Sequence, residues 1–256
     1  ALAQHDLKRL LAYHSVENIG IIALGIGLGV FGLSCHNPLL IYLGFAGGLF
    51  HVVNHALFKS LLFLGAGSVL HSAGTREIDI LGGLLKRMPT TGTTFLIGSV
   101  AICGLPPLNG FASEFMIYLA SLGSLSMKGG ASTAGFLVIG SLALIGGLAV
   151  ACFTKAFGVI FLGEPRSEEA DGAHETGKLM RFPLLVLAGF CAVLGLTGPL
   201  VLKALAPVIA VVAGGGSEAL PFPYEGAAAL WKITGVSFAG ALLLAFLLFI
   251  RSRLMA

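Results

Sequence analysis

The sequence predicts an all-α integral membrane protein with about seven transmembrane helices, one of them broken at Pro106 and Pro107. The first observation is composition, because 56% of the residues are hydrophobic and only 11% are charged, with a mean hydropathy of +0.96. About a quarter of the residues in a soluble domain are charged. The second is a series of apolar runs near the roughly 20 residues that a helix needs to cross a bilayer. The third is that Gly, Pro and polar clusters separate these runs.

The first two spans are predicted from long apolar runs near the start of the chain. The first covers 16–33, after a polar lead-in. The second covers 42–72 and is longer than a perpendicular crossing requires. We therefore expect the second helix to tilt, protrude or break, with Gly44, Gly47 and Gly48 as its weak points.

A helix break is predicted in the middle of the chain. The third span, 90–104, and the fourth, 108–124, are separated by Pro106 and Pro107. The two prolines remove backbone donors, and Gly110 permits unusual dihedral angles. These residues predict a discontinuity at membrane depth.

The second half of the chain contains three further predicted spans, a polar loop and a Gly-rich linker. In order these are the span 133–162, the polar loop 163–181, the span 182–201 with an apolar continuation to 212 broken at Pro199 and Pro207, the linker 214–226, and the span 228–250. The chain starts inside a polar connection without an initiator Met, so we expect it to be part of a longer protein. The net charge of +3 is too small and too dispersed to predict a nucleic-acid partner.

The second span contains His51, His55 and Lys59 at successive four-residue spacings. Four residues advance a helix by only about 40° from a full turn, so these side chains form one polar stripe. Ionisable groups at membrane depth cost on the order of 3 kcal/mol and usually mark an ion pathway or a polar contact inside a bundle.

Three interpretations of this polar stripe stay open. Histidine exchanges a proton near neutral pH, and burial moves lysine toward that range, which favours proton transfer. A histidine pair at this spacing also suits a metal or haem, although Lys59 would repel a cation. In the third interpretation each side chain only hydrogen-bonds to a carbonyl of a neighbouring helix.

Glu114 follows the predicted break on an otherwise apolar helix. Broken helices at membrane depth often form ion sites, so we expect Glu114 to be a proton site or counter-ion. The alternative is a packing carboxylate capped by Ser113 or by a nearby amide. Lys155 lies near the end of the fifth span, where it either belongs to the path or reaches the headgroups.

Weaker candidates are His14 and Glu17, which share spacing with Asn18 at the start of the first span, and His71 at the far end of the second. His14, Glu17 and Asn18 either form a local pair or cap, or line the path near a membrane face. The four cysteines occur singly, which favours apolar packing over disulfide or iron–sulfur use.

These features give the chain a family resemblance. It resembles the antiporter-like, proton-conducting membrane subunits of respiratory complex I, Mrp-type cation/proton antiporters and membrane-bound hydrogenases. The resemblance rests on QHDLKRLLAYHS at 4–15, HVVNHALFKSLLF at 51–63 and GLPPLNGFASE at 104–114. AYHSVENIGII at 12–22 and KAFG at 155–158 are similar to the hydrogenase-4 component B and formate hydrogenlyase branch.

The resemblance implies an architecture and a partly complete path. The family has a pair of inverted repeats, each with a broken helix, and a line of Lys, His and Glu through the membrane. Residues 1–130 would be part of the second repeat, and 131–256 the trailing helices with the loop 163–181 and the linker 214–226. The Glu and Lys pair of the first repeat would lie outside this chain.

Three functions follow from the resemblance. The first is a proton-translocating subunit of a hydrogenase or NADH dehydrogenase-like complex, with no catalytic centre, metal or cofactor of its own. Nickel–iron and iron–sulfur centres would lie in partner subunits, and the partners would be other membrane and peripheral subunits, protons and the bilayer of a prokaryotic cytoplasmic membrane. The second is a Na⁺ or K⁺/proton antiporter subunit, and the third is a structural membrane anchor.

Overall fold

The computed structural model describes residues 1–127, 130–214 and 224–254 and is all-α, apart from an isolated bridge between Asp6 and Glu77. The elements are, in chain order, α1 (Leu7–Ser34), α2 (Pro38–Ala73), the 3-10 turn η1 (Ile78–Ile80), α3 (Leu84–Arg87), α4 (Pro89–Ile102), α5 (Asn109–Leu125), α6 (Gly130–Phe161), α7 (Glu168–Asp171), α8 (Lys178–Leu196), α9 (Gly198–Val212) and α10 (Tyr224–Leu254).

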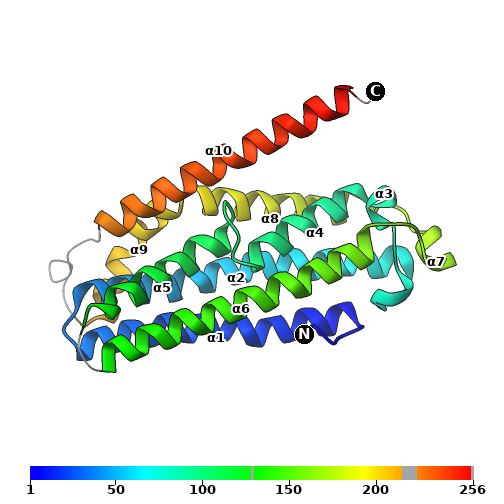
Figure 1. Cartoon of the computed structure of the whole chain (residues 1–256). Helices are drawn as coiled ribbons and strands as arrows, with labels where there is room; N and C mark the ends of the chain where they lie inside the picture. Colours follow the sequence, from blue (N-terminus) through cyan, green and yellow to red (C-terminus); the bar gives the residue numbers. More distant parts are fainter. Residues whose placement is uncertain (128–129, 215–223, 255–256) are drawn as a thin grey trace.

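The long helices run side by side in one bundle, and the short elements η1, α3 and α7 gather at one end of it (Figure 1). Among the described residues, α1, α2, α6 and α8 are long and apolar enough to cross a membrane. The predicted seventh span, 228–250, lies within α10. The Gly-rich linker falls mostly on 215–223, outside the described residues.

Helix α1 starts earlier than the predicted first span. Its first residue is Leu7, because Asp6 caps the helix by accepting a hydrogen bond from the Arg9 amide (2.9 Å). A side-chain acceptor at this position satisfies one of the amides that the first turn leaves free. The predicted span 16–33 lies inside α1, which begins before it because Leu7 and the residues after it are already helical.

Helix α2 is continuous, so of the three predicted outcomes, tilting, protrusion or a break, the break at its glycines does not occur. These glycines instead allow close contact between helices. A Cβ added to Gly44 would lie 2.9 Å from the Gly29 Cα of α1, and one added to Gly48 would lie 2.9 Å from the Ile26 amide nitrogen. On another face, a Cβ on Gly47 would lie 2.6 Å from the Ile117 side chain of α5. The glycines therefore set how closely α1 and α5 approach α2.

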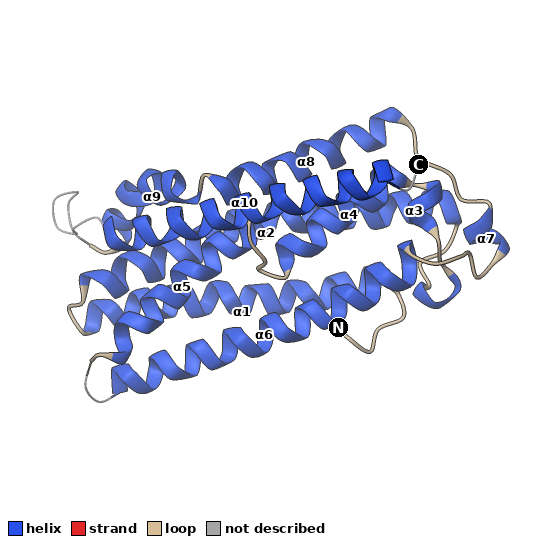
Figure 2. Ribbon diagram, turned by 45° about the horizontal axis from the view of Figure 1, so that its top comes forward, coloured by secondary structure: helices blue, strands red, loops and turns tan. Residues whose placement is uncertain are grey.

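The predicted third and fourth spans are two half-helices that lie end to end along α2 (Figures 1 and 2). α4 has 14 residues and α5 has 17, each below the roughly 20 needed to cross a bilayer alone. The segment between them contains Pro106, Pro107 and Gly104, whose φ of 61° is the left-handed conformation that glycine adopts readily. The predicted break is confirmed, and it divides one crossing rather than separating two.

Helix α8 covers this break. A Cβ added to Gly195 would lie 2.6 Å from the Leu108 carbonyl carbon and 2.8 Å from the Asn109 amide nitrogen. The predicted sixth span ends at Leu196, earlier than expected, and α9 begins at Gly198. Pro199 sits in the first turn of α9, where its missing amide hydrogen is not needed.

Pro207 does not break α9, contrary to the prediction, because the helix continues through it to Val212. The resulting helix has 15 residues and packs against α2 and α10. It is therefore a short apolar helix of the bundle rather than an irregular continuation of the sixth span.

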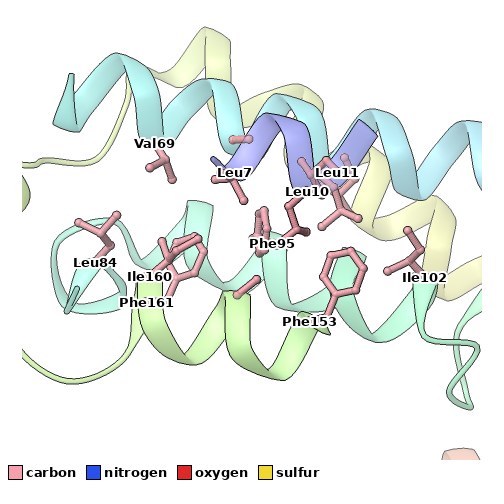
Figure 3. Packing of buried hydrophobic residues seen from close by; sticks show 14 of the residues in the cluster. Leu7, Leu10, Leu11, Val69, Leu84, Phe95, Ile102, Phe153, Ile160 and Phe161 are labelled. Atoms are coloured by element: carbon pink, nitrogen blue, oxygen red, sulfur yellow. The ribbon is translucent and has the colours of Figure 1, made fainter. Parts of the chain in front are cut away.

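Buried apolar side chains form two clusters along the bundle. One gathers Leu7 and Leu10 of α1 with aromatic side chains such as Phe95 and Phe153 of α4 and α6 (Figure 3). The other includes Phe50. Since Phe58 belongs to the first cluster, the stretch of α2 with His51 and Asn54 lies between the two.

The polar loop 163–181 hydrogen-bonds to the end of the bundle at which α4 begins. Glu175 accepts hydrogen bonds from the Thr90 amide (2.7 Å) and the Thr91 hydroxyl (2.7 Å) at the start of α4. A carboxylate there also interacts favourably with the helix dipole. Lys86 pairs with Glu164 and holds the pKa of that carboxyl below its usual value, but both side chains are exposed and the pair contributes little stability.

The glycine contacts generate a stability prediction. Gly44→Ala should destabilise the protein by about 1 to 3 kcal/mol, the usual effect of overpacking, because the new methyl group meets the α1 backbone. Gly67→Ala in the same helix should be neutral or stabilising, since nothing lies within 4 Å of the new Cβ. Thermal unfolding of the two variants in detergent measures the difference, and equal melting temperatures would contradict the close contact.

Candidate functional site

The predicted polar stripe lies on the central helix α2, between α1 and the broken pair α4 and α5. The structure separates its three members by environment. His51 is fully buried, His55 is partly exposed and Lys59 is 6% exposed. The stripe is therefore not a uniform lining of one channel.

His51 connects α1 to α5 through hydrogen bonds at both ring nitrogens. Its Nδ1 lies 2.9 Å from the Ser113 Oγ of α5, and its Nε2 lies 3.1 Å from the Asn18 Oδ1 of α1. All three side chains are fully buried. A buried polar group without partners would cost several kcal/mol, so this bridge stabilises the approach of three helices.

Asn54 ties α2 to the first residue of α5. Its Nδ2 donates to the Asn109 carbonyl (2.7 Å) and to the Ser113 Oγ (2.9 Å), while its Oδ1 accepts from the Asn109 Nδ2 (3.1 Å). These bonds join α2 to both the backbone and the side chain of Asn109 beside the break. Asn54 therefore holds the broken end of α5 in register with His51.

Ser113 and Glu114 are consecutive in α5 and face different parts of the bundle. Ser113 contacts α2, whereas Glu114 lines a cavity of about 380 Å³ whose far wall includes Leu142 and Gly146 of α6. The alternative that Ser113 caps Glu114 is not what the structure shows, because the Ser113 hydroxyl lies against Gly110, Asn54 and His51.

Glu114 is only 7% exposed and is the one Asp, Glu, Lys or Arg among the residues that line this cavity. Its carboxylate packs against the break, where a Cβ on Gly104 would lie 2.8 Å from its Oε1. Any larger residue at 104 would therefore displace the carboxylate. The left-handed turn and the carboxylate position depend on the same glycine.

Lys59 reaches from α2 to α1, where its Nζ donates to the Leu11 carbonyl. The ammonium also lies 4.9 Å from the centre of the Phe63 ring. The carbonyl contact is what the structural interpretation of the stripe expects for this residue. It does not exclude proton exchange, since a carbonyl can accept from either form of the amine.

Several buried polar atoms beside Lys59 have no hydrogen-bond partner within the described residues. They are His14 Nδ1 and Nε2, Glu17 Oε1 and His55 Nε2. Glu17 Oε2 lies 2.6 Å from His14 Nδ1, an ion-pair contact without hydrogen-bond geometry, and the His14 ring packs on Phe153 of α6. The predicted local pair of His14 and Glu17 is confirmed, and unpaired atoms of this kind are typical of places where protons or water bind.

The remaining candidates lie away from this region. Lys155 donates to the Leu2 carbonyl in the N-terminal segment (3.1 Å), and His71 is exposed at the end of α2. The described residues contain no group of three or more His, Cys, Asp or Glu side chains that could hold a metal ion. Cys103, Cys152 and Cys191 are buried as free thiols.

Sequence reasoning did not predict that the amide and hydroxyl groups of the bridge hydrogen-bond to His51 and to the start of the broken helix. Asn18, Asn54, Ser113 and Asn109 are all fully buried and connect the ionisable residues to the break. The signal was present, because each interrupts an otherwise apolar helix. Which of them meet depends on helix packing, and the sequence alone does not provide it.

The Asn54 contacts generate a second stability prediction. Asn54→Leu keeps the branched shape of the side chain but removes its hydrogen bonds to Asn109, so it should destabilise the protein by about 1 to 3 kcal/mol. Ser99→Ala is the control, since the Ser99 hydroxyl bonds to the Phe95 carbonyl of its own helix (2.8 Å). Thermal unfolding of the full-length protein in detergent tests this, and equal losses in the two variants would refute a special role for Asn54.

The chain is similar in sequence to two proteins of Escherichia coli. Formate hydrogenlyase subunit 3 of Escherichia coli is 47% identical over 227 residues, covering 88% of this chain and 35% of that protein. Hydrogenase-4 component B of the same bacterium is 48% identical over 199 residues, covering 77% and 30%. The chain thus spans about a third of the length of these relatives.

A solved structure of similar fold is respiratory complex I from Thermus thermophilus with bound NADH. The superposition has a TM-score of 0.65 at 27% identity and covers 84% of this chain and 41% of the matched one. Residues 1–137, which include α1, α2, the break and the start of α6, match the family described as NADH:quinone oxidoreductase/Mrp antiporter, TM. The chain is therefore a membrane protein of the NADH:quinone oxidoreductase/Mrp antiporter transmembrane family.

Proposed function

We propose that this chain is part of a proton-translocating membrane subunit in a hydrogenase-4 or formate hydrogenlyase type complex, or a related NADH dehydrogenase-like complex. The observation that carries the proposal is the buried bridge from Asn18 through His51 to Ser113, beside the break that positions Glu114. The identity to hydrogenlyase and hydrogenase-4 subunits supports the type of complex.

The geometry suits movement of a proton within the membrane. His51, His55 and Lys59 occupy successive turns of α2, and each can gain or lose a proton. Glu114 lies in α5, the second half of the broken helix, and lines a cavity that extends toward α6. A broken helix end offers oriented backbone dipoles that stabilise a changing charge. These four residues and Lys155 are the proposed path, with His14, Glu17 and His71 as peripheral groups.

The energy for this movement would come from partner subunits. Electron transfer through nickel–iron and iron–sulfur centres there would change the local field and shift protons on this chain. The partners would be membrane and peripheral subunits of the same complex in a prokaryotic cytoplasmic membrane. Residues 1–130 would supply part of the second inverted repeat, and 131–256 the trailing helices.

A Na⁺ or K⁺/proton antiporter subunit is the second candidate, because the matching family includes Mrp antiporters. One observation favours it: the buried Asn109 Oδ1 at the break has no hydrogen-bond partner within the described residues. Sodium prefers several oxygen ligands, however, and among the described residues lining the cavity beside α6, Glu114 is the only Asp or Glu. A structural anchor is the third function, and it is consistent with the Lys59 contact with the Leu11 carbonyl and with the His51 bridge between α1 and α5.

Glu114→Gln in the full-length protein tests the leading proposal. The substitution keeps the shape of the side chain but removes the exchangeable proton, so proton translocation should be lost while the complex still assembles. The measurement is quenching of a pH-sensitive dye in membrane vesicles during electron transfer by the complete complex.

Glu169→Gln is the matched control, because Glu169 is an exposed carboxylate in α7. It should leave dye quenching unchanged. Normal quenching in Glu114→Gln would refute the role of Glu114. Proton flux that requires added Na⁺ or K⁺ would instead favour the antiporter function.

A further inference from the structure

Asn18 determines which ring nitrogen of His51 always carries a hydrogen. The Asn18 Nδ2 donates to the His14 carbonyl (2.8 Å), which can only accept, so the amide orientation is fixed. Its Oδ1 therefore faces the His51 Nε2 (3.1 Å). An amide oxygen also only accepts, so the Nε2 must be the donor in every protonation state of the ring.

Ser113 is the only group paired with the other nitrogen of His51 in the described structure. A hydroxyl can donate once and accept twice. The Ser113 Oγ accepts from the Asn54 Nδ2 (2.9 Å), whose orientation is fixed because the same nitrogen donates to the Asn109 carbonyl. The hydroxyl hydrogen is then left with two possible acceptors, the Gly110 carbonyl (3.0 Å) and the His51 Nδ1 (2.9 Å).

These two acceptors correspond to the two protonation states of His51. In the neutral ring the Nδ1 has a lone pair, and the Ser113 hydroxyl donates to it. When a proton binds to the Nδ1, the N–H donates to the Ser113 Oγ, and the hydroxyl turns to the Gly110 carbonyl. One N–H bond forms at Nδ1 as one O–H bond of a hydronium ion breaks and leaves water. No heavy atom of the protein has to move, and neither nitrogen of the ring loses its partner.

We infer that the Ser113 hydroxyl is a two-position switch that allows fully buried His51 to gain and lose a proton at Nδ1, on the side facing the broken helix. The inference rests on the proposed function, in which His51 exchanges protons during transport. Ser113 acts as a positioning residue, because it hydrogen-bonds to the ring that exchanges the proton and keeps its own hydroxyl hydrogen. Asn18 on the opposite side holds the ring and prevents exchange at Nε2.

The other ionisable side chains on the helices that pack around His51 do not replace this switch. On α1, α2 and α5 these are Lys8, Arg9, Tyr13, His14, Glu17, Tyr42, His55, Lys59, His71, Glu114 and Tyr118. None of them hydrogen-bonds to the His51 ring among the described residues. Changes in their charge can bias the protonation of His51, but the partners of its nitrogens stay the same.

The test compares Ser113→Ala with Ser121→Ala in the full-length protein within its complex. Ser121 is also a fully buried serine of α5, but its hydroxyl donates to the Ile117 carbonyl of its own helix (2.8 Å). Ser113→Ala should reduce proton flux about tenfold, because the protonated ring loses a charge-assisted hydrogen bond. Ser121→Ala should leave the flux near the wild-type value.

Nitrogen NMR of ¹⁵N-histidine in the same proteins gives a readout that general loss of packing would not produce. The His51 signals are identified by their absence in His51→Phe. In the neutral wild-type ring the Nδ1 should be the nitrogen without hydrogen, and its signal should move toward that of an unbonded nitrogen in Ser113→Ala. The signal should not move in Ser121→Ala.

Three results would overturn the inference. These are a wild-type ring with its hydrogen on Nδ1, an Nδ1 signal unaffected by Ser113→Ala, or equal losses of flux in the two serine variants. The wild-type spectrum decides the first point even if Ser113→Ala does not fold. Normal flux in His51→Phe would refute the proposed function of His51, while the NMR result would still report separately on the hydroxyl contact.

Discussion

The structure depends on one constraint, that polar groups buried in an apolar bundle must find their partners inside the protein. His51 meets this constraint by bonding to Asn18 of α1 and Ser113 of α5 at once. Because both partners are fully buried, the three helices have to approach closely and in one register. The glycines of α2 make that approach possible, so the apolar contact and the polar bridge support each other.

The same constraint explains how a broken helix is tolerated in the middle of the bundle. Asn54 donates to the Asn109 carbonyl at the start of α5, and α8 packs closely over the segment between α4 and α5. The break in turn orients Ser113 toward α2 and Glu114 toward α6. A buried carboxylate and a buried imidazole thus lie on two sides of one half-helix, connected through consecutive residues.

The predictions from sequence succeeded where they rested on local chemistry. Pro106 and Pro107 predicted the break, and the four-residue spacing correctly placed His51, His55 and Lys59 on one helix. They failed where packing decides the outcome. Gly44 and Gly48 were expected to weaken α2 but instead contact α1, and Pro207 was expected to break a helix that continues through it. Glycine and proline have several structural uses, and their neighbours determine which one applies.

The sequence by itself determined that the chain is a helical membrane protein with ionisable groups at membrane depth, since composition and helical periodicity are properties of consecutive residues. Only the tertiary structure decided which groups pair. Asn18 and Ser113 are 95 residues apart in numbering, yet both bond to His51, while the adjacent Ser113 and Glu114 face apart. Hydrogen bonds require contact within about 3 Å, and helix packing alone sets those distances across the bundle.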